Sequence, residues 1–199
     1  ESENIRFHFQ KMSDTEIKGF VSTSEEAFRN INKFFNSKLP KKIDFFVWES
    51  KENAKNLFKR NLGFSNPDFC LIHSHSHQTK GPELTHVVSN YSTKMIKKSE
   101  LISEGTAVCF NLSKKNKEQK VKDWLKANNK KISIVEIWNN WENYPEEFTY
   151  PLSGIFVKKI IDNFGQEKFI AFFSNQTYEN AKLVFGEKLD ILIKDFENK

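Results

Sequence analysis

The sequence contains few of the residues that interrupt or cross-link a chain. Its 199 residues include seven glycines, five prolines and two cysteines. Cys70 and Cys109 do not form a CxxC pair, which disfavours a zinc knuckle or a thioredoxin-type site, and they are either joined in a disulfide or present as two free thiols. No apolar run approaches the ~20 residues that a membrane helix needs, so we expect no membrane-spanning segment.

Positive charge is in excess but is not concentrated. The net charge is +5, yet the lysines are scattered and arginine is nearly absent. A nucleic-acid-binding face should show one basic stripe with arginine or interleaved aromatic residues, so we expect no nucleic-acid partner. The chain has no signal peptide and opens on ESENIRFHF, as a trimmed mature form would, so we expect an exported or extracytoplasmic protein.

Aromatic residues, by contrast, are plentiful. The chain has twenty phenylalanines, and 38% of its residues are hydrophobic. That content is enough to build a core, and the length suits one compact unit with two lobes.

The first part of the chain has the pattern of a small sheet with helices. Residues 5–10 alternate apolar and polar side chains, and 42–48 and 68–75 are apolar runs of strand length. Between them, 24–35 has helical spacing and Ser50 is a suitable N-cap for a second helix. We interpret 61–68 as a turn. The order β-α-β-α-β predicts a sheet-bearing N-terminal lobe over residues 1–80.

The remainder, residues 81–199, has the pattern of a helical lobe. Pro145 and Pro151 are predicted to bracket a loop, and Gly165 and Gly186 fall where helices should end. The fold class is therefore α+β, a small N-terminal sheet with helices followed by a mostly helical C-terminal lobe. The predicted helices span 82–92, 100–112, 117–128, 152–163, 166–173, 177–184 and 187–197.

The segment GPELTH, residues 81–86, carries the first chemical signal. Four of the five histidines lie between positions 73 and 86. In a zinc-peptidase helix of the form HExxH, two histidines four residues apart bind the metal from one helical face, and the intervening glutamate activates a metal-bound water. Here Glu83 occupies the position of that base, His86 that of the second ligand, and Pro82 that of the first.

With three further segments, this motif makes the chain resemble the peptidase-MA-like, gluzincin-type branch of zinc metallopeptidases. The resemblance implies a gluzincin-like fold whose cleft lies between the two lobes and is floored by the 82–92 helix. In that group the third metal ligand is a glutamate on a later helix, and Glu104, eighteen positions after His86, matches it. Tyr150 would donate to a developing oxyanion if the site were active. The resembling segments are ELTH (83–86), SEGTA (103–107), YPLSGIFVKKIIDNFG (150–165) and VFGEKLDILIKDF (184–196).

Proline at position 82 decides the leading hypothesis. A proline suits the first turn of a helix but has no side-chain donor for a metal. His86 and Glu104 alone make two protein ligands, whereas catalytic zinc normally has three. We therefore expect a degenerate, non-catalytic metallopeptidase homologue that binds a peptide or protein partner in the former substrate cleft.

Two alternatives remain open. In the first, the chain is an active zinc-dependent peptidase with Glu83 as general base, and a substitute ligand, His77, completes the site with His86 and Glu104. In the second, His73, His75 and His77 share one strand face and bind zinc, copper or nickel. The simpler interpretation of these histidines is a polar strand end at the rim of a cleft. The expected cofactor is accordingly zinc or none.

Overall fold

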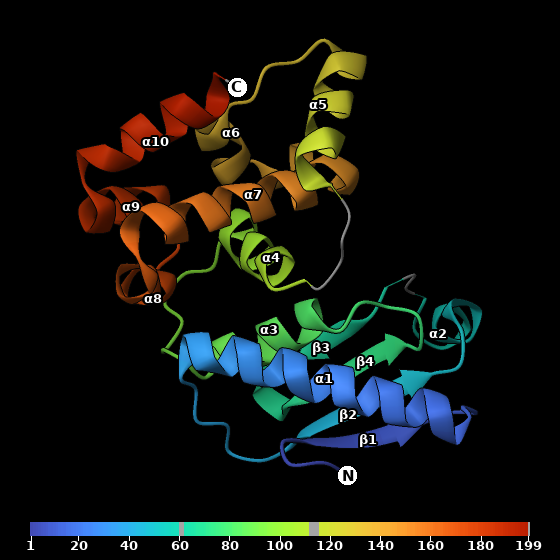
Figure 1. Cartoon of the computed structure of the whole chain (residues 1–199). Helices are drawn as coiled ribbons and strands as arrows, with labels where there is room; N and C mark the ends of the chain where they lie inside the picture. Colours follow the sequence, from blue (N-terminus) through green and yellow to red (C-terminus); the bar gives the residue numbers. More distant parts are fainter. Residues whose placement is uncertain (60–61, 112–115, 199) are drawn as a thin grey trace. The chain divides into compact units, whose positions relative to one another are not determined.

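The computed structural model describes residues 1–59, 62–111 and 116–198. It confirms the α+β class (Figure 1). The chain divides into two compact units, one of Glu1–Ser92 with residues 110 and 111, the other of Thr93–Cys109 with residues 116–198. The GPELTH helix therefore belongs to the sheet-bearing unit, and the division differs from the predicted boundary after residue 80.

The first unit contains a four-stranded sheet in the order β1-β2-β4-β3. Strands β1, β2 and β4 are parallel, and β3 is antiparallel to β4. Part of the predicted turn at 61–68 is instead β3 and a 3-10 helix, because a strand of three residues is too short to show a period. The strands are β1 (Ile5–Phe9), β2 (Ile43–Trp48), β3 (Phe64–Asn66) and β4 (Leu71–His75), and the helices are α1 (Asp14–Phe35), α2 (Lys51–Phe58), α3 (Gly81–Asn90) and the 3-10 helix η1 (Pro67–Phe69).

Helices cover both faces of this sheet. Helix α1 begins ten residues earlier than predicted, at a capping box in which the Ser13 and Glu16 side chains each bond the other's main-chain N–H. Figure 1 shows α1 lying along the sheet, and the Phe20 ring packs edge-on against Phe45 of β2, 5.4 Å between centroids. On the opposite face, Phe58 of α2 packs against Trp48 at 5.3 Å.

The second unit is helical, as expected, and the predicted helices are present with end shifts of a few residues. Gly165 and Gly186 end α7 and α9 with positive φ angles of 83° and 67°, as predicted. Helix α6 and a 3-10 helix were not predicted, and position 112, the predicted end of α4, lies outside the described residues. The elements are α4 (Glu100–Cys109), α5 (Lys117–Asn128), α6 (Ile134–Asn139), η2 (Trp141–Asn143), α7 (Glu146–Phe164), α8 (Gln166–Phe173), α9 (Tyr178–Phe185) and α10 (Glu187–Glu197).

The prediction that Pro151 borders a loop is wrong, because Pro151 lies inside α7. Pro145 is the N-cap of that helix, and the helix continues through the second proline. A proline within a helix removes one main-chain hydrogen bond and usually bends or ends it. Here Phe148, Leu152 and Phe156 are fully buried along α7, so packing offsets the lost bond.

Helices α4 and α7 approach each other through glycines. A Cβ atom on Gly105 would lie 2.6 Å from the Ser153 carbonyl oxygen and from the Val157 side chain. A Cβ on Gly154 would collide with the Val108 side chain. Such separations are shorter than van der Waals contact, so only glycine permits this packing. The small residues of the SEGTA and PLSG segments therefore serve helix packing in the second unit.

Candidate functional site

Helix α3 presents the motif residues on its less buried face. Pro82 and His86 are one helical turn apart, Glu83 lies beside them, and all three are half-buried together with Asn90. Residues three to four apart share a face of an α-helix, so these side chains lie together on one side of α3. The other face of α3 fits the core through Leu84, Val87 and Val88, which are completely buried.

The start of α3 is fixed by its first two residues. The helix begins at Gly81, and a Cβ atom on that residue would collide with the Phe110 carbonyl oxygen. Pro82 follows within the first turn, where its missing N–H has no helical acceptor to lose. Position 82 is thus a sound helix start, and its side chain has no donor atom for a metal. With His86 as the single imidazole of this face, the donor set of α3 does not fit a catalytic zinc.

The other two motif residues lie in the second unit. Glu104 is the one half-buried residue in the stretch 101–108 of α4, and the others in that stretch are buried. Tyr150 is half-buried on α7, and its ring centroid is 5.8 Å from that of Trp141. Glu83 and His86, by contrast, belong to the first unit.

The histidines of the HSHSH segment do not share one strand face. Strand β4 ends at His75, and His77 lies in the turn that follows. The strand alternation that would place all three histidines on one face therefore holds for His73 and His75 but does not reach His77. His77 is exposed near the start of α1, where its charge adds to the Ser13 hydrogen bonds that lower the pKa of Glu16. In the described ranges, no three His, Cys, Asp or Glu side chains are grouped so that they could hold a metal ion.

His73 instead takes part in a stack of four rings that crosses the whole sheet. We call His8, Phe46, His73 and Phe64 the ring column. The strand register places them directly opposite one another on β1, β2, β4 and β3. Successive ring centroids are 4.2, 4.9 and 4.8 Å apart, with interplanar angles of 10°, 18° and 22°. Burial lowers the pKa of His73, which favours the neutral imidazole within the column.

Lys80, which precedes α3, was not singled out from the sequence. Its Nζ lies 3.7 Å from the centroid of the Phe20 ring and donates to the carbonyl oxygens of Ser76 and Gln78. Burial lowers the pKa of Lys80 to about 8. The lysine connects the HSHSH turn to α1 and so fixes the chain just before Pro82. One lysine among many carries no sequence signal for this role, because the burial arises from tertiary packing.

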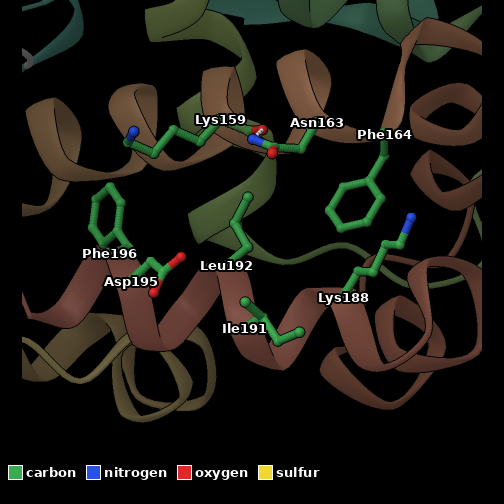
Figure 2. A pocket seen from close by; sticks show the side chains of 8 residues that line it. All are labelled: Lys159, Asn163, Phe164, Lys188, Ile191, Leu192, Asp195 and Phe196. Atoms are coloured by element: carbon green, nitrogen blue, oxygen red, sulfur yellow. Dashed lines mark hydrogen bonds between the residues drawn. The ribbon is translucent and has the colours of Figure 1, made fainter.

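The second unit has a groove of about 400 Å³ between α7 and α10 (Figure 2). Figure 2 shows the side chains of Leu192 and Phe196 pointing from α10 toward α7, with Lys159 near Phe196 and Lys188 near Phe164. None of the residues predicted for the site lines it. Its lining combines two lysines, one aspartate and one asparagine with apolar side chains, and it contains no histidine or cysteine.

Both cysteines are free, so the disulfide alternative is wrong. The buried Cys70 Sγ donates to the Tyr91 hydroxyl at 3.4 Å. Cys109 is half-buried, and burial raises the pKa of its thiol. A raised pKa disfavours the reactive thiolate form of Cys109.

No known family model matches this chain, and no curated protein matches it significantly. Among the described residues, no helix combines the length and the apolar character that crossing a membrane requires.

Proposed function

We propose that this chain is a degenerate zinc-peptidase homologue that binds a peptide or protein partner without cleaving it. The observation that carries the proposal is the place of Pro82, in the first turn of α3 and on the same half-buried face as Glu83 and His86. This face keeps the glutamate and one imidazole of an HExxH helix but lacks the donor that would complete a zinc site.

The same face supports a binding role. Glu83, His86 and Asn90 are polar and half-buried, so with Pro82 at its start they form a mainly polar strip on a helix whose other side is anchored in the core. A rigid helix with accessible acceptors and donors can hold the main chain of a peptide. A bound peptide stays intact because the donor set of this face does not support a metal-activated water to attack it.

Zinc analysis is the first test. Protein purified without a histidine tag should contain far less than one zinc per chain, whereas a chain with tightly held stoichiometric zinc would contradict the proposal. Pro82→His should gain a zinc site, because the introduced imidazole and that of His86 would be one turn apart on the helix. Pro82→Ala, which adds no donor, is the matched control and should stay without zinc.

Glu104 is tested in the Pro82→His background. If Glu104 is the third ligand, as the resemblance implies, Pro82→His combined with Glu104→Ala should bind zinc at least roughly tenfold more weakly than Pro82→His alone. Equal zinc affinities would remove Glu104 from the site and with it the gluzincin-like arrangement.

The binding role is tested with a casein digest as the peptide mixture. Mass spectrometry should recover the peptides uncleaved after incubation, and a subset should be retained by the protein. A charge reversal on the α3 face, Glu83→Lys, should reduce that retention, while Lys168→Glu on exposed α8 surface should leave it unchanged. Hydrolysis that disappears in Glu83→Gln would instead show an active peptidase.

A further inference from the structure

Strand β1 lies at one edge of the sheet, and half of its main-chain groups point away from the other strands. The N–H of Gln10 donates to the Val47 carbonyl, and the N–H of Ile43 donates to the Asn4 carbonyl. Because main-chain direction alternates along a strand, the even-numbered residues of β1 face β2 and the odd-numbered ones face outward. The Ile5 carbonyl accepts a bond from Ser2. The outward groups of Phe7 and Phe9 have no hydrogen-bond partner among the described residues.

The ring column ends at this same edge. Its inner members are enclosed, since His73 is flanked by Phe46 and Phe64 in the column and by Phe58 of α2 at 4.8 Å. His8 is the outer member, its side chain is 40% exposed, and one face of its ring stacks on Phe46. The other face points toward the free edge. A hollow of about 400 Å³ borders the column here, lined by His8, Phe46 and Trp48 among others.

The spacing of the column matches that of the strands. Neighbouring strands lie about 4.8 Å apart, and the column's centroids are separated by 4.2 to 4.9 Å. The rings therefore stand upright on the sheet, one per strand. A ligand that continues the column in the same way needs both a main chain paired with β1 and a ring opposite His8. An added peptide strand has this geometry, whereas a free planar molecule would leave the main-chain groups of Phe7 and Phe9 unpaired.

The charge around the first residues of β1 indicates which side chain should accompany the ring. Arg6, Lys41 and Lys42 form ion pairs with Glu1 and Asp44 at 2.8 to 3.4 Å. Within this group of ion pairs three cations share two carboxylates, an excess of one positive charge in the group itself, and the Asp44 carboxylate also contacts the His8 ring at 3.2 Å. Arg6 lies two residues before His8 on the same face of the strand and its side chain is 50% exposed. A carboxylate two residues from the ring of the incoming strand would complement this excess.

We propose that β1 is a docking edge for an extended segment of a partner protein, which adds a fifth strand to the sheet and stacks an aromatic side chain on His8 with an acidic residue opposite Arg6. The affinity comes from main-chain bonds to Phe7 and Phe9, and the specificity comes from the ring and the carboxylate. This surface does not depend on the zinc-peptidase resemblance, so the two proposals stand or fall separately.

The test uses the acetylated and amidated heptapeptide Thr-Glu-Thr-Tyr-Thr-Glu-Thr as probe, with a glutamate two residues from the tyrosine on either side so that both strand directions are covered. In an NMR titration of ¹⁵N-labelled protein, the amides of β1 should shift and those of Phe7 and Phe9 should exchange more slowly with solvent. Replacing the tyrosine by alanine should weaken binding roughly two- to tenfold, the range for one aromatic pair. Replacing both glutamates by lysine should also weaken it.

Variants of the protein separate the two contributions. His8→Ala should bind the tyrosine and alanine peptides equally, while His77→Ala, at an exposed histidine outside the column, should keep the preference. A probe methylated on the nitrogens that face β1 should lose binding altogether. The proposal is overturned if the tyrosine and alanine peptides bind alike, or if the shifts fall outside β1. It is also overturned if Phe7 and Phe9 amides are protected without peptide in a concentration-dependent dimer, because the edge would then pair with a second copy.

Discussion

The two units of this chain are held together by different kinds of contact. In the first, stacked rings cross a four-stranded sheet, and three titratable side chains with pKa values lowered by burial, His73, His75 and Lys80, lie in or beside it. In the second, helices α4 and α7 meet through glycines at main-chain distance. The stability of the second unit should therefore fall when a single methyl group is added at these glycines. The stability of the first unit should depend on pH.

Tryptophan fluorescence can follow the units separately. Trp48 lies in the first unit, while Trp124, Trp138 and Trp141 lie in the second. Variants that lack Trp48 therefore report unfolding of the second unit alone.

The largest effect is expected for Gly105→Ala. The added methyl group would lie 2.6 Å from the Ser153 carbonyl oxygen, which belongs to a main chain that cannot move without displacing α7. We expect the free energy of unfolding of the second unit to fall by about 2 to 3 kcal/mol in urea titrations. A fall below about 0.5 kcal/mol, the range of ordinary surface substitutions, would mean that the two helices do not approach as closely as their glycines indicate.

A moderate effect is expected when the first unit is acidified. Burial lowers the pKa of His73 and of His75 in the folded chain below the unfolded value of about 6.5. The unfolded state therefore binds more protons, and stability that is fully present above pH 6.5 is lost as the pH falls toward the folded pKa values. His73 packs against Phe46, Trp48, Phe58 and Phe64, which carry no charge to compensate.

Urea unfolding at pH 7 and pH 5 measures this loss in a variant that retains Trp48 as its only tryptophan, with phenylalanine at positions 124, 138 and 141. His73→Phe retains a ring in the column but does not titrate, so it should lose less stability between the two pH values. An unchanged pH dependence in this variant would assign the effect to other groups. The second unit has no histidine and should show no matching step.

A related effect on the stability of the first unit is expected from Lys80, at alkaline instead of acidic pH. Its folded pKa of about 8 lies below the ordinary 10.5, so the cost of burying the ammonium is present below pH 8 and disappears as the pH rises to 10.5. The unfolding free energy of the first unit should increase over this range by roughly 1 kcal/mol, since the partly solvated side chain is screened. Lys80→Met keeps the packing on Phe20 and should remove the increase.

The smallest effect is a gain. Gly19 lies within α1, and a Cβ atom there would meet no atom within 4 Å. Gly19→Ala should stabilise the first unit by about 0.5 to 1 kcal/mol, because alanine is the better helix former. This variant is the matched counterpart of Gly105→Ala, since both place the same methyl group on a helical glycine. If the two substitutions changed the unfolding free energy of their units by similar amounts and in the same direction, the proposed difference in packing between the units would be wrong.

Local sequence features predicted much of this structure because their causes are local. The span of α5, the cap at Ser50, and the glycines that end α7 and α9 follow from side-chain periodicity and from glycine's tolerance of positive φ. The GPELTH segment also starts a helix as predicted, since proline is preorganised for the first turn. Predictions failed where burial overrode a local rule, as at Pro151, and where an element was too short for a period, as at β3 and α6.

The order of amino acids was thus sufficient for the α+β class, the presence of the α3 helix and the absence of a metal donor at position 82, because each depends on residues that are neighbours along the chain. Packing in three dimensions was needed to form one column from His8, Phe46, His73 and Phe64, to join α3 to the sheet-bearing unit, and to hold Lys80 over Phe20. Strand order and register bring together residues that are far apart in sequence, and no local pattern encodes which strands become neighbours.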